Sequence, residues 1–571
     1  MGVQGPRCQT VRKQKRSRLL QLAIAGAGAA LIAPLAFTSA APAAPNIATS
    51  DNAQGAVNES GHRNYKPRAI VTTDPELDDL NSLIRMLLYS NEIRIEGLVY
   101  ASGQHHYTGD PEAGIAPYRW KAGQSHIEDA LDAYALVEDN LRVHDKDYPT
   151  VEDLRSKYRV GNIEVVHDIS ESTPGSQLIA DVLLDDKPGP VYLQAWGGLS
   201  TIARGLKDIE ERYKDTPEWD AIYEKVSNKA IITSWGTQDN TYADYIAPNW
   251  PQVENRRVST GIWGYGTRNS ILPEDRYLVD AEWTQENVSE VGPLGDLYRV
   301  WGDGKFMGIN AGPEWEGNPV YERCFPPDDC YMGPFHDYTD FFGFDTSLPE
   351  NSRENLIARG YTRLWTDLQE PGAFISEGDS PNFALLIDNG LRSYESATYG
   401  GWGGRQVQSA TTPYLYTPPS DEAGDVDPET GTRPNGYHAS RWWNDIQMDF
   451  AARLQWSVTP NHSDANHEPT ARVPQGMLNI DVRPGQRVNL VGIARDSDGD
   501  DVTSNWWQYP EAGTYPGTVD VIQKDQGRSP VAHFVVPEDA QLGQTIHLIF
   551  EVKDDGTPQM TSYQRVIATV R

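Results

Sequence analysis

Four acidic side chains stand within six positions of one another in the segment "IVTTDPELDDLNS" at residues 70–82: Asp74, Glu76, Asp78 and Asp79. An acid at the start of a helix is often an N-cap, which accounts for one of the four but not for the group. Like charges this close are costly unless a cation neutralises them, so the cluster favours a divalent metal site. A cation beside a carboxylate also suits the activation of a water molecule.

The elements that must position these acids follow from the surrounding pattern. Residues 68–72 form a short β-branched run, residues 79–89 have helical periodicity and residues 93–100 predict a second strand. Similar units recur in "GPVYLQAWGGLSTIARGL" (189–206), "KAIITSWGTQDN" (229–240) and "GDSPNFALLIDNGL" (378–391), the last predicted as a loop and a helix. The acids therefore stand in the turn between a strand and a helix.

Alternating units of this kind predict an α/β fold with a mainly parallel sheet and helices on both faces. Ligands of such sheets bind beyond the carboxyl ends of the strands, where the acids stand. From residue 473 onward, β-rich runs recur without helical periodicity, which predicts a C-terminal all-β, immunoglobulin-like sandwich. The predicted domains are a signal peptide (1–43), a flexible N-terminus (44–65), the α/β domain (66–458), a linker (459–472) and the sandwich (473–571).

The first residues and the charge indicate an extracellular protein. A basic run at residues 12–18, an apolar run at 19–37 and small residues at 38–44 predict a cleaved signal peptide rather than an uncleaved anchor. The formal net charge of −32 argues against nucleic acid polymers and anionic membranes as partners. We therefore expect a secreted protein that has no membrane association after the signal is removed.

Two smaller motifs leave alternatives open. Cys324 and Cys330 are close in sequence, and in an exported chain this spacing favours one disulfide over the alternative of two free thiols. The acidic run "DSDGDD" at residues 496–501 suits either calcium or a charged hairpin turn. An EF-hand would need a longer ligand pattern, so the turn is favoured.

Aromatic and histidine side chains near the predicted loops suit a carbohydrate ligand. Trp196, Trp235 and Trp402 stand in or near glycine-rich loops, where a ring can lie flat under a sugar, although packing explains most aromatic residues. Among them we expect Trp402 to contact the substrate. His105 and His106 follow the second strand, and His105 is the predicted substrate contact. Either histidine would suit acid catalysis, or both are ordinary loop residues.

The same segments resemble a known family. "TTDPELDD" is similar to the nucleoside hydrolase signature Asp-x-Asp-Pro-Gly-x-Asp-Asp. "LQAWGGLSTIA" resembles that family's strand and turn ending Gly-x-Leu-Thr-Asn-Ile-Ala, and "GDSPNFALLID" resembles its late His-Asp-Pro-x-x-Ala motif. More closely, the chain from residue 67 to 456, followed by a β-module, resembles a bacterial family of nucleoside hydrolase-like proteins described as cellulose-binding.

The resemblance implies a role for each matching residue. Asp74 would bind calcium and act as general base on the attacking water, and Asp79 would bind calcium. Asp78 would hydrogen-bond sugar hydroxyls. The backbone carbonyl of Trp196 would reach the metal, and Asp379 would be the last calcium ligand.

The chain departs from the nucleoside hydrolase pattern in the other half of the site. Thr72 replaces the first Asp of the signature, Glu76 replaces its Gly, and Gly378 replaces a His that helps to protonate the leaving base in many nucleoside hydrolases. The sugar-binding region is only loosely similar to "GTQDNTYADYIAPNW", where Asn240 and Asp244 would be the substrate contacts. The metal and water half is kept, and the leaving-group half is altered.

Two functions follow from these observations. The first, which we favour, is a secreted, calcium-dependent hydrolase that acts on a glycosyl bond of a nucleoside or carbohydrate. The second is a non-catalytic protein that binds cellulose or another polysaccharide. Hydrolysis of an N-glycosidic bond needs activation of the leaving group, so the altered half of the site is what separates the two.

Overall fold

The computed structural model describes residues 66–301 and 369–571, apart from residues 105, 119 and 121–124. The predicted signal peptide and flexible N-terminus, the two cysteines of the predicted disulfide and His105 lie outside the described residues, so these predictions stay predictions. Among the helices within the described ranges, none has the length and apolar character that a membrane span requires.

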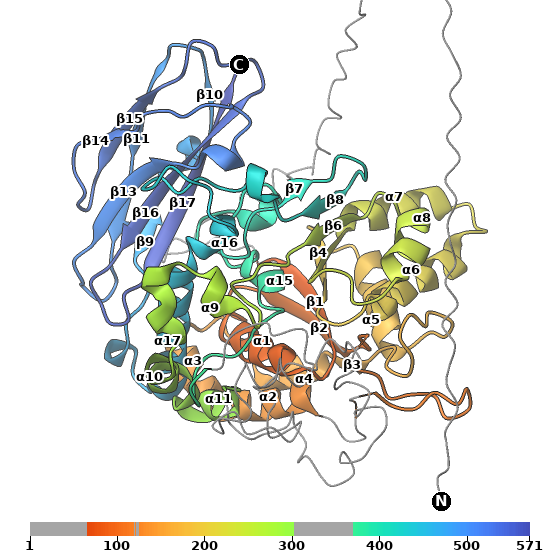
Figure 1. The fold of residues 1–571 in the computed structure, drawn as a ribbon. Helices are drawn as coiled ribbons and strands as arrows, with labels where there is room; N and C mark the ends of the chain where they lie inside the picture. Colours follow the sequence, from red (N-terminus) through yellow and green to blue (C-terminus); the bar gives the residue numbers. More distant parts are fainter. Residues whose placement is uncertain (1–65, 105, 119, 121–124, 302–368) are drawn as a thin grey trace, which may run out of the picture. The chain divides into compact units, whose positions relative to one another are not determined.

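An eight-stranded sheet forms the centre of the N-terminal region (Figure 1). Its strand order is β3-β2-β1-β4-β5-β6-β8-β7, and every neighbouring pair is parallel except β7 with β8. The strands are β1 (Arg68–Thr73), β2 (Arg94–Tyr100), β3 (Tyr158–Val160), β4 (Val191–Ala195), β5 (Ala230–Ser234), β6 (Glu254–Arg257), β7 (Val407–Gln408) and β8 (Leu415–Thr417).

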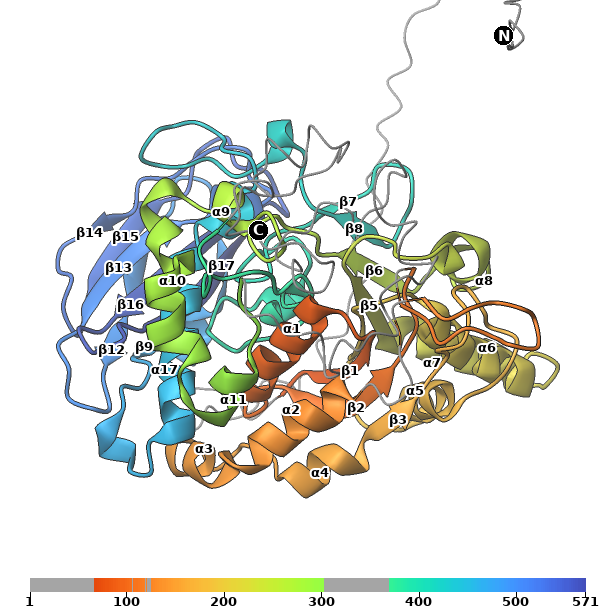
Figure 2. The ribbon, with the colours of Figure 1, turned by 60° about the horizontal axis from the view of Figure 1, so that its bottom comes forward.

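Helices cover both faces of this sheet, because alternate residues of its strands enter different cores. In β1, Ala69 and Val71 join the core that contains α1 and α17, whereas Ile70 joins the core built with α5 and α6. In Figure 2 these two groups of helices lie on opposite sides of β1. The helices are α1 (Leu77–Leu88), α2 (His126–Ala135), α3 (Glu138–His144), α4 (Val151–Ser156), α5 (Pro174–Leu184), α6 (Ser200–Tyr213), α7 (Trp219–Lys229), α8 (Ala247–Asn249), α9 (Thr267–Ser270), α10 (Ala281–Thr284), α11 (Gly292–Leu297), α15 (Pro381–Ala384), α16 (Tyr437–Ser440) and α17 (Trp443–Val458).

The predicted α/β fold, with a mainly parallel sheet between two helical layers, is confirmed. The first strand ends one residue later than predicted, and the first helix begins two residues earlier and ends one residue earlier than predicted. The late segment at residues 378–391 differs more, because only the four residues of α15 are helical there. Most of this segment is loop, and that loop carries Asp379 to the sheet edge.

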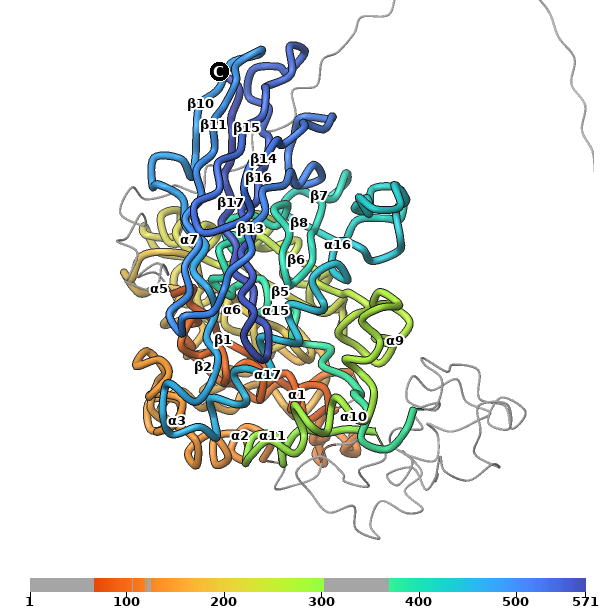
Figure 3. Tube along the Cα trace, turned by 90° about the vertical axis from the view of Figure 1, so that its left-hand side faces the viewer, coloured from red at the N-terminus to blue at the C-terminus, as the bar shows by residue number. Residues whose placement is uncertain are grey.

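The C-terminal region is built from strands in several sheets, as Figure 3 traces in blue. One sheet has the order β10-β17-β16-β13, a second has the order β11-β15-β14, and β12 pairs with β9. The β-rich segment at residues 488–495 is divided between two sheets, because β11 and β12 pair with different partners. The strands are β9 (Thr470–Arg472), β10 (Asn479–Val482), β11 (Arg487–Val491), β12 (Ile493–Arg495), β13 (Thr503–Gln508), β14 (Ile522–Gln523), β15 (Val531–Val535), β16 (Thr545–Lys553) and β17 (Thr561–Val570).

The C-terminal strands pack directly on the α/β region. Tyr509, Ile549 and Tyr563 belong to the same hydrophobic core as α1 and α17. Asp445 of α17 accepts hydrogen bonds from the ammonium of Lys553 at 3.1 Å and from the hydroxyl groups of Thr561 and Tyr563. Burial of apolar area and this polar contact together fix the two regions against each other.

The register of the central strands brings their carboxyl ends to one edge. Thr72 of β1 pairs with Ala195 of β4, and Thr73 pairs with Tyr100 of β2. Asp74 and Trp196 are therefore the next residues along neighbouring strands. The loop after β5 starts at the same level, because Ser234 pairs with Ala195.

A buried ion pair ties the loop of Asp379 to helix α1. The guanidinium of Arg85 on α1 donates to both carboxylate oxygens of Glu377, and one of these bonds measures 2.9 Å. Tyr298 and Ser380 also donate to the Glu377 carboxylate. Both partners of the pair are at most 1% exposed. The four hydrogen bonds to the Glu377 carboxylate therefore replace bonds to water.

We predict that Arg85→Met lowers the free energy of unfolding by about 3–5 kcal/mol, because it leaves the Glu377 charge buried and unpaired. Urea denaturation followed by tryptophan fluorescence measures this loss. The matched control is Arg155→Met, which removes an exposed ion pair with Asp132 and should cost less than about 1 kcal/mol. Equal losses in the two variants would contradict an anchoring role for the buried pair.

Candidate functional site

The acids of the first motif gather in the turn between β1 and α1. Asp74 is 0% exposed and Asp79 is 1% exposed, and Glu76 is the N-cap residue of α1. No side chain caps this helix through a hydrogen bond from the N-cap position. The N-cap interpretation of the motif therefore fails for Glu76, and the acids need another explanation.

Hydrogen bonds from Thr73, itself bonded to His126, and from a backbone amide hold the Asp79 carboxylate in place. The hydroxyl of Thr73 donates to Asp79 Oδ1 at 2.6 Å, and the backbone amide of Asp74 donates to the same oxygen at 3.1 Å. Because that hydroxyl has given away its hydrogen, it accepts from Nε2 of His126 at 3.0 Å. Burial lowers the pKa of His126 to about 3, so the ring is neutral. The second oxygen of Asp79, Oδ2, is buried without a hydrogen-bond partner among the described residues.

Asp379 reaches the same place from a segment about 300 residues later. Its side chain is 3% exposed, and Oδ1 is buried without a hydrogen-bond partner in the described part of the chain. Burial raises the pKa of Asp379 well above its usual value, and the charges of Asp79, Asp78, Asp74 and Glu76 raise it further. Burial followed by the charge of Asp78 likewise raises the pKa of Asp79. The protein has concentrated negative charge where water does not screen it.

Trp196 contributes its backbone to this edge, and its ring lies in the core. The indole is 0% exposed and donates to Gln194 at 3.0 Å, while the carbonyl oxygen accepts from Nε2 of Gln238 at 2.8 Å. A carbonyl oxygen has two lone pairs, so this bond leaves one for a cation. Oε1 of Gln238 is itself buried without a hydrogen-bond partner among the residues described, which adds a further oxygen to the group.

Three glycines from three loops leave room for the carboxylates. A Cβ at Gly103 would lie 1.9 Å from Asp74 Oδ2, and one at Gly197 would lie 2.8 Å from the same oxygen. A Cβ at Gly378 would lie 2.3 Å from Asp78 Oδ2. These distances are shorter than a Cβ contact allows, so a larger residue at any of the three positions would displace the neighbouring carboxylate.

The contact at Gly378 gives a physical reason for the altered leaving-group half. A histidine at this position would need the space that the Asp78 carboxylate occupies. The histidine at this edge comes instead from the loop after β2, where Nδ1 of His106 lies 3.4 Å from Asp74 Oδ1 and 3.7 Å from Glu76 Oε2. The loop turns back there through a paired contact between Gly103 and His106.

The arrangement is chemically suited to a hard cation. Its donors are carboxylates from Asp74, Asp79 and Asp379 and the carbonyl of Trp196, with Glu76 close by. One carboxylate oxygen each from Glu76, Asp78 and Asp79 lies within 4.8 Å of the others. Oxygen donors of this kind are those that calcium takes, usually six to eight at a time. The residues therefore fit a calcium ion.

The residues predicted to bind the sugar do not all lie at the acid cluster. Asp78 lies in the cluster and is 9% exposed. Asn240 and Asp244 are exposed, and the backbone amide of Asn240 donates to the ring of His167. Trp402 is 1% exposed and lies in the hydrophobic core, so neither face of its ring is open in this structure. Substrate contact by Asn240, Asp244, Trp402 and the undescribed His105 stays a prediction.

Sequence reasoning missed the two residues that precede Asn240. Gln238 reaches the Trp196 carbonyl, and the Asp239 carboxylate accepts from the backbone amide of Leu199 at 2.8 Å and from that of Thr241 at 3.0 Å. Asp239 thus holds the loop after β5 against the turn after β4. The only available signal was their position at the end of a predicted strand in "GTQDN".

Two further motifs are explained by local hydrogen bonds. The hydroxyl of Thr72, which replaces an acid of the signature, donates to the carbonyl of Gln194 in β4 and so is used within the sheet. In the acidic run after β12, Asp496 Oδ1 accepts from the backbone amides of Asp498, Gly499 and Asp500 at 2.8–3.1 Å. This supports the charged-turn interpretation, and calcium binding there stays a prediction.

Two family profiles match the chain. The profile of the family described as "Cellulose-binding Sde182, nucleoside hydrolase-like domain" matches residues 68–406. The profile of "Cellulose-binding protein Sde0182, C-terminal domain" matches residues 488–570. No curated protein matches the chain.

Among solved structures, the chain is similar to a nucleoside hydrolase-related hypothetical protein from Saccharophagus degradans that is associated with carbohydrate metabolism. The identity is 22%, the TM-score is 0.62, and the match covers 89% of this chain and 100% of that one, so the likeness shows the fold.

The immunoglobulin module of the Drosophila receptor phosphatase DLAR also matches, with 15% identity over 18% of this chain and 50% of that one, but its TM-score of 0.13 supports no conclusion. The family profile covers more than half of the chain and includes all three segments that meet at the acid cluster. The chain therefore belongs to the cellulose-binding Sde182 family, with a nucleoside hydrolase-like domain followed by that family's C-terminal domain.

Proposed function

We propose that the nucleoside hydrolase-like domain is a calcium-dependent hydrolase of a glycosyl bond in a nucleoside or carbohydrate, exported by the signal at residues 1–43. The observation that carries the proposal is the meeting of Asp74, Asp79 and Asp379 with the Trp196 carbonyl at one edge of the sheet. The orphaned oxygens of Asp79 and Asp379 support it, because a buried carboxylate oxygen without a donor is costly unless a cation faces it.

The proposed mechanism assigns a task to each group. Asp74, Asp79, Asp379 and the Trp196 carbonyl would hold the calcium ion. When bound, the ion supplies a water molecule of lowered pKa. Asp74 would accept a proton from the attacking water as general base, since it directly follows β1 and faces the space kept open by two glycines. Asp78, the most exposed of these aspartates, accepts hydrogen bonds from the sugar hydroxyls.

His106 is the proton donor that the proposal assigns to the leaving group. Gly378 cannot serve, and His106 is the histidine that the structure places beside Asp74 and Glu76. Both carboxylates lie near Nδ1 and so orient the ring, which leaves Nε2 for the departing oxygen or base. General acid help of this kind typically contributes about a hundred- to ten-thousandfold in rate.

A second candidate function is carbohydrate binding without catalysis. The family description names cellulose binding, and the aspartates proposed to hold the metal are at most 3% exposed. In this alternative the ion and acids only stabilise the edge of the sheet. Polysaccharide would then bind elsewhere on the domain or on the C-terminal region.

We predict that Asp74→Asn abolishes hydrolysis, with a loss of about a hundred- to ten-thousandfold in kcat, while the fold is kept. Asparagine preserves the size of the side chain but cannot accept the proton. Asp78→Asn should mainly raise KM. Assays of the purified protein on nucleosides and plant-wall oligosaccharides, with calcium and with chelator, measure both. Asp181→Asn, on the exposed surface of α5, is the control. Full activity in Asp74→Asn would remove the acid cluster from the reaction.

We predict that Asp379→Asn stabilises the calcium-free protein but removes its stabilisation by calcium. The raised folded pKa of Asp379 means that folding opposes its ionisation, so the penalty is absent below the ordinary aspartate pKa and grows as pH rises toward the folded value. In chelator, the variant should therefore melt higher than the parent at about pH 8, and the difference should shrink toward about pH 4. Melting curves with and without calcium test this, and an unchanged calcium response would contradict the metal assignment.

The binding function makes a separate prediction. If it holds, the parent protein and Asp74→Asn should sediment equally with crystalline cellulose, because the general base has no part in binding. If the protein stays in the supernatant and turns over a small glycoside, the binding function is contradicted and the hydrolase function is supported. Sedimentation combined with the absence of turnover on both substrate sets would favour binding without catalysis.

A further inference from the structure

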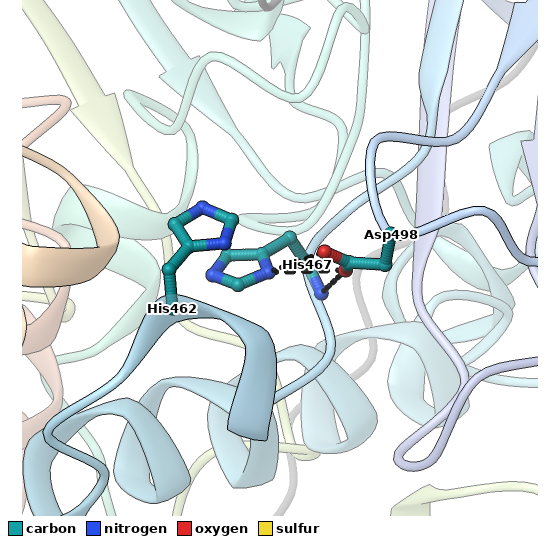
Figure 4. A group of neighbouring side chains, drawn as sticks. All are labelled: His462, His467 and Asp498. Carbon is teal, nitrogen blue, oxygen red and sulfur yellow. Dashed lines mark hydrogen bonds and ion pairs between the residues drawn. The ribbon is translucent and has the colours of Figure 1, made fainter.

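Three histidines and an aspartate meet where the α/β region joins the C-terminal strands, in a cluster separate from the acids at the sheet edge. His144 is the last residue of α3, and His462 lies in a short 3₁₀ helix (His462–Asp464). His467 precedes β9, and Asp498 follows β12. Figure 4 shows the rings of His462 and His467 face to face, with Asp498 on the other side of His467.

The hydrogen bonds of this cluster fix which ring nitrogens carry hydrogen. Nδ1 of His467 lies 3.0 and 3.1 Å from the two Asp498 oxygens, and Nε2 of His144 lies 2.8 Å from the carbonyl oxygen of Thr459. A carboxylate and a carbonyl oxygen only accept. Both of these nitrogens must therefore be the donors, and in a neutral imidazole the other nitrogen then has a lone pair.

The two remaining nitrogens face each other. Nδ1 of His144 lies 2.9 Å from Nε2 of His467, and both side chains are more than nine-tenths buried. Two lone pairs at this distance repel unless a proton or a metal ion lies between them. A metal ion bound by both lone pairs removes the repulsion without a third proton on the two rings.

We propose that this cluster binds one divalent transition metal ion of the zinc class, through Nδ1 of His144 and Nε2 of His467. Two nitrogens bound to one zinc at about 2.0–2.1 Å stand about 3.3 Å apart in a tetrahedral site, so a small separation of the rings admits the ion. Nitrogen donors select zinc, copper or nickel over calcium. The ion is thus chemically different from the one proposed at the acid cluster.

The third ligand is His462. One ligand atom from each of His462, His467 and Asp498 lies within 4.8 Å of the others. The ring of His462 stacks on His467 with centroids 3.8 Å apart, and its side chain is exposed, so His462 would turn its ring from this stack to ligate the ion. A water molecule completes the four ligands.

The surrounding bonds are those of a built metal site. Histidine ligands usually donate their second nitrogen to a carboxylate or a backbone carbonyl, which fixes the ring and its tautomer. Asp498 does this for His467, and Thr459 does it for His144. The indole of Trp456 stacks on His144 at 5.6 Å and on His467 at 5.1 Å, so both rings are held in place.

The ion would connect segments far apart in the chain. His144 belongs to the α/β region, His467 to the segment that leads into the C-terminal strands, and Asp498 to a loop of those strands. Ligation would cross-link α3 to the start of the C-terminal region, and so metal binding would be coupled to the stability of that junction.

Titration of the tag-free protein with zinc tests the proposal. The protein is first dialysed against chelator and then kept in millimolar calcium, which occupies oxygen-rich sites. Calorimetry should show one zinc ion per chain with a dissociation constant of about 1 μM or tighter. Cobalt should give the intense visible bands of a tetrahedral, nitrogen-ligated ion.

Four variants decide the assignment. His467→Gln should remove the stoichiometric site, and Asp498→Asn should weaken binding about ten- to a hundredfold. His462→Ala, at an exposed position, should weaken binding at least about tenfold with no effect on folding. His533→Ala, in β15, is the control and should bind as the parent does. Absence of zinc binding by the parent, or equal binding by the parent and His462→Ala, would overturn the proposal, whether or not His467→Gln folds.

Discussion

The constraint on which this structure depends is the concentration of carboxylates in a space that excludes water. Asp74, Asp79 and Asp379 are almost fully buried, and their charges act on one another with little screening. Such a group persists only when a cation or protons offset it. The register of β1 and β4, the glycines beside the acids and the anchoring of the late loop all serve to keep these charges together.

Glu377 and Asp379, two residues apart, differ in whether protein donors compensate their charge. Glu377 and Asp379 are both buried, but Glu377 receives donors from Arg85, Tyr298 and Ser380. Asp379 Oδ1 receives none among the described residues. The neutralised acid fixes the loop on α1, and the acid without a donor is the one held toward the cluster. Charge compensation therefore distinguishes the structural carboxylate from the one proposed to bind metal better than burial does.

The C-terminal strands form part of the same folded unit. Their buried residues Tyr509, Ile549 and Tyr563 enter the core of the α/β region, and Asp445 of α17 bonds to three of their side chains. A surface that packs this closely is not available to a ligand. Any polysaccharide that the C-terminal region binds must therefore contact its other faces.

The sequence by itself determined the parts that depend on local pattern. Strand β1, helix α1 and the gathering of Asp74 and Asp79 follow from a β-branched run, a proline and a helical period within residues 68–88. Family resemblance added Asp379 and the Trp196 carbonyl, because those motifs keep their order along the chain. The tertiary structure decided the rest. It turned Gln238 inward and left Asn240 exposed. It buried the ring of Trp402 in the core, and it placed Gly378 against the Asp78 carboxylate. It also paired His144 with His467 across 323 positions. In loops no periodicity fixes which way a side chain points, and contacts between distant segments exist only once the cores have packed.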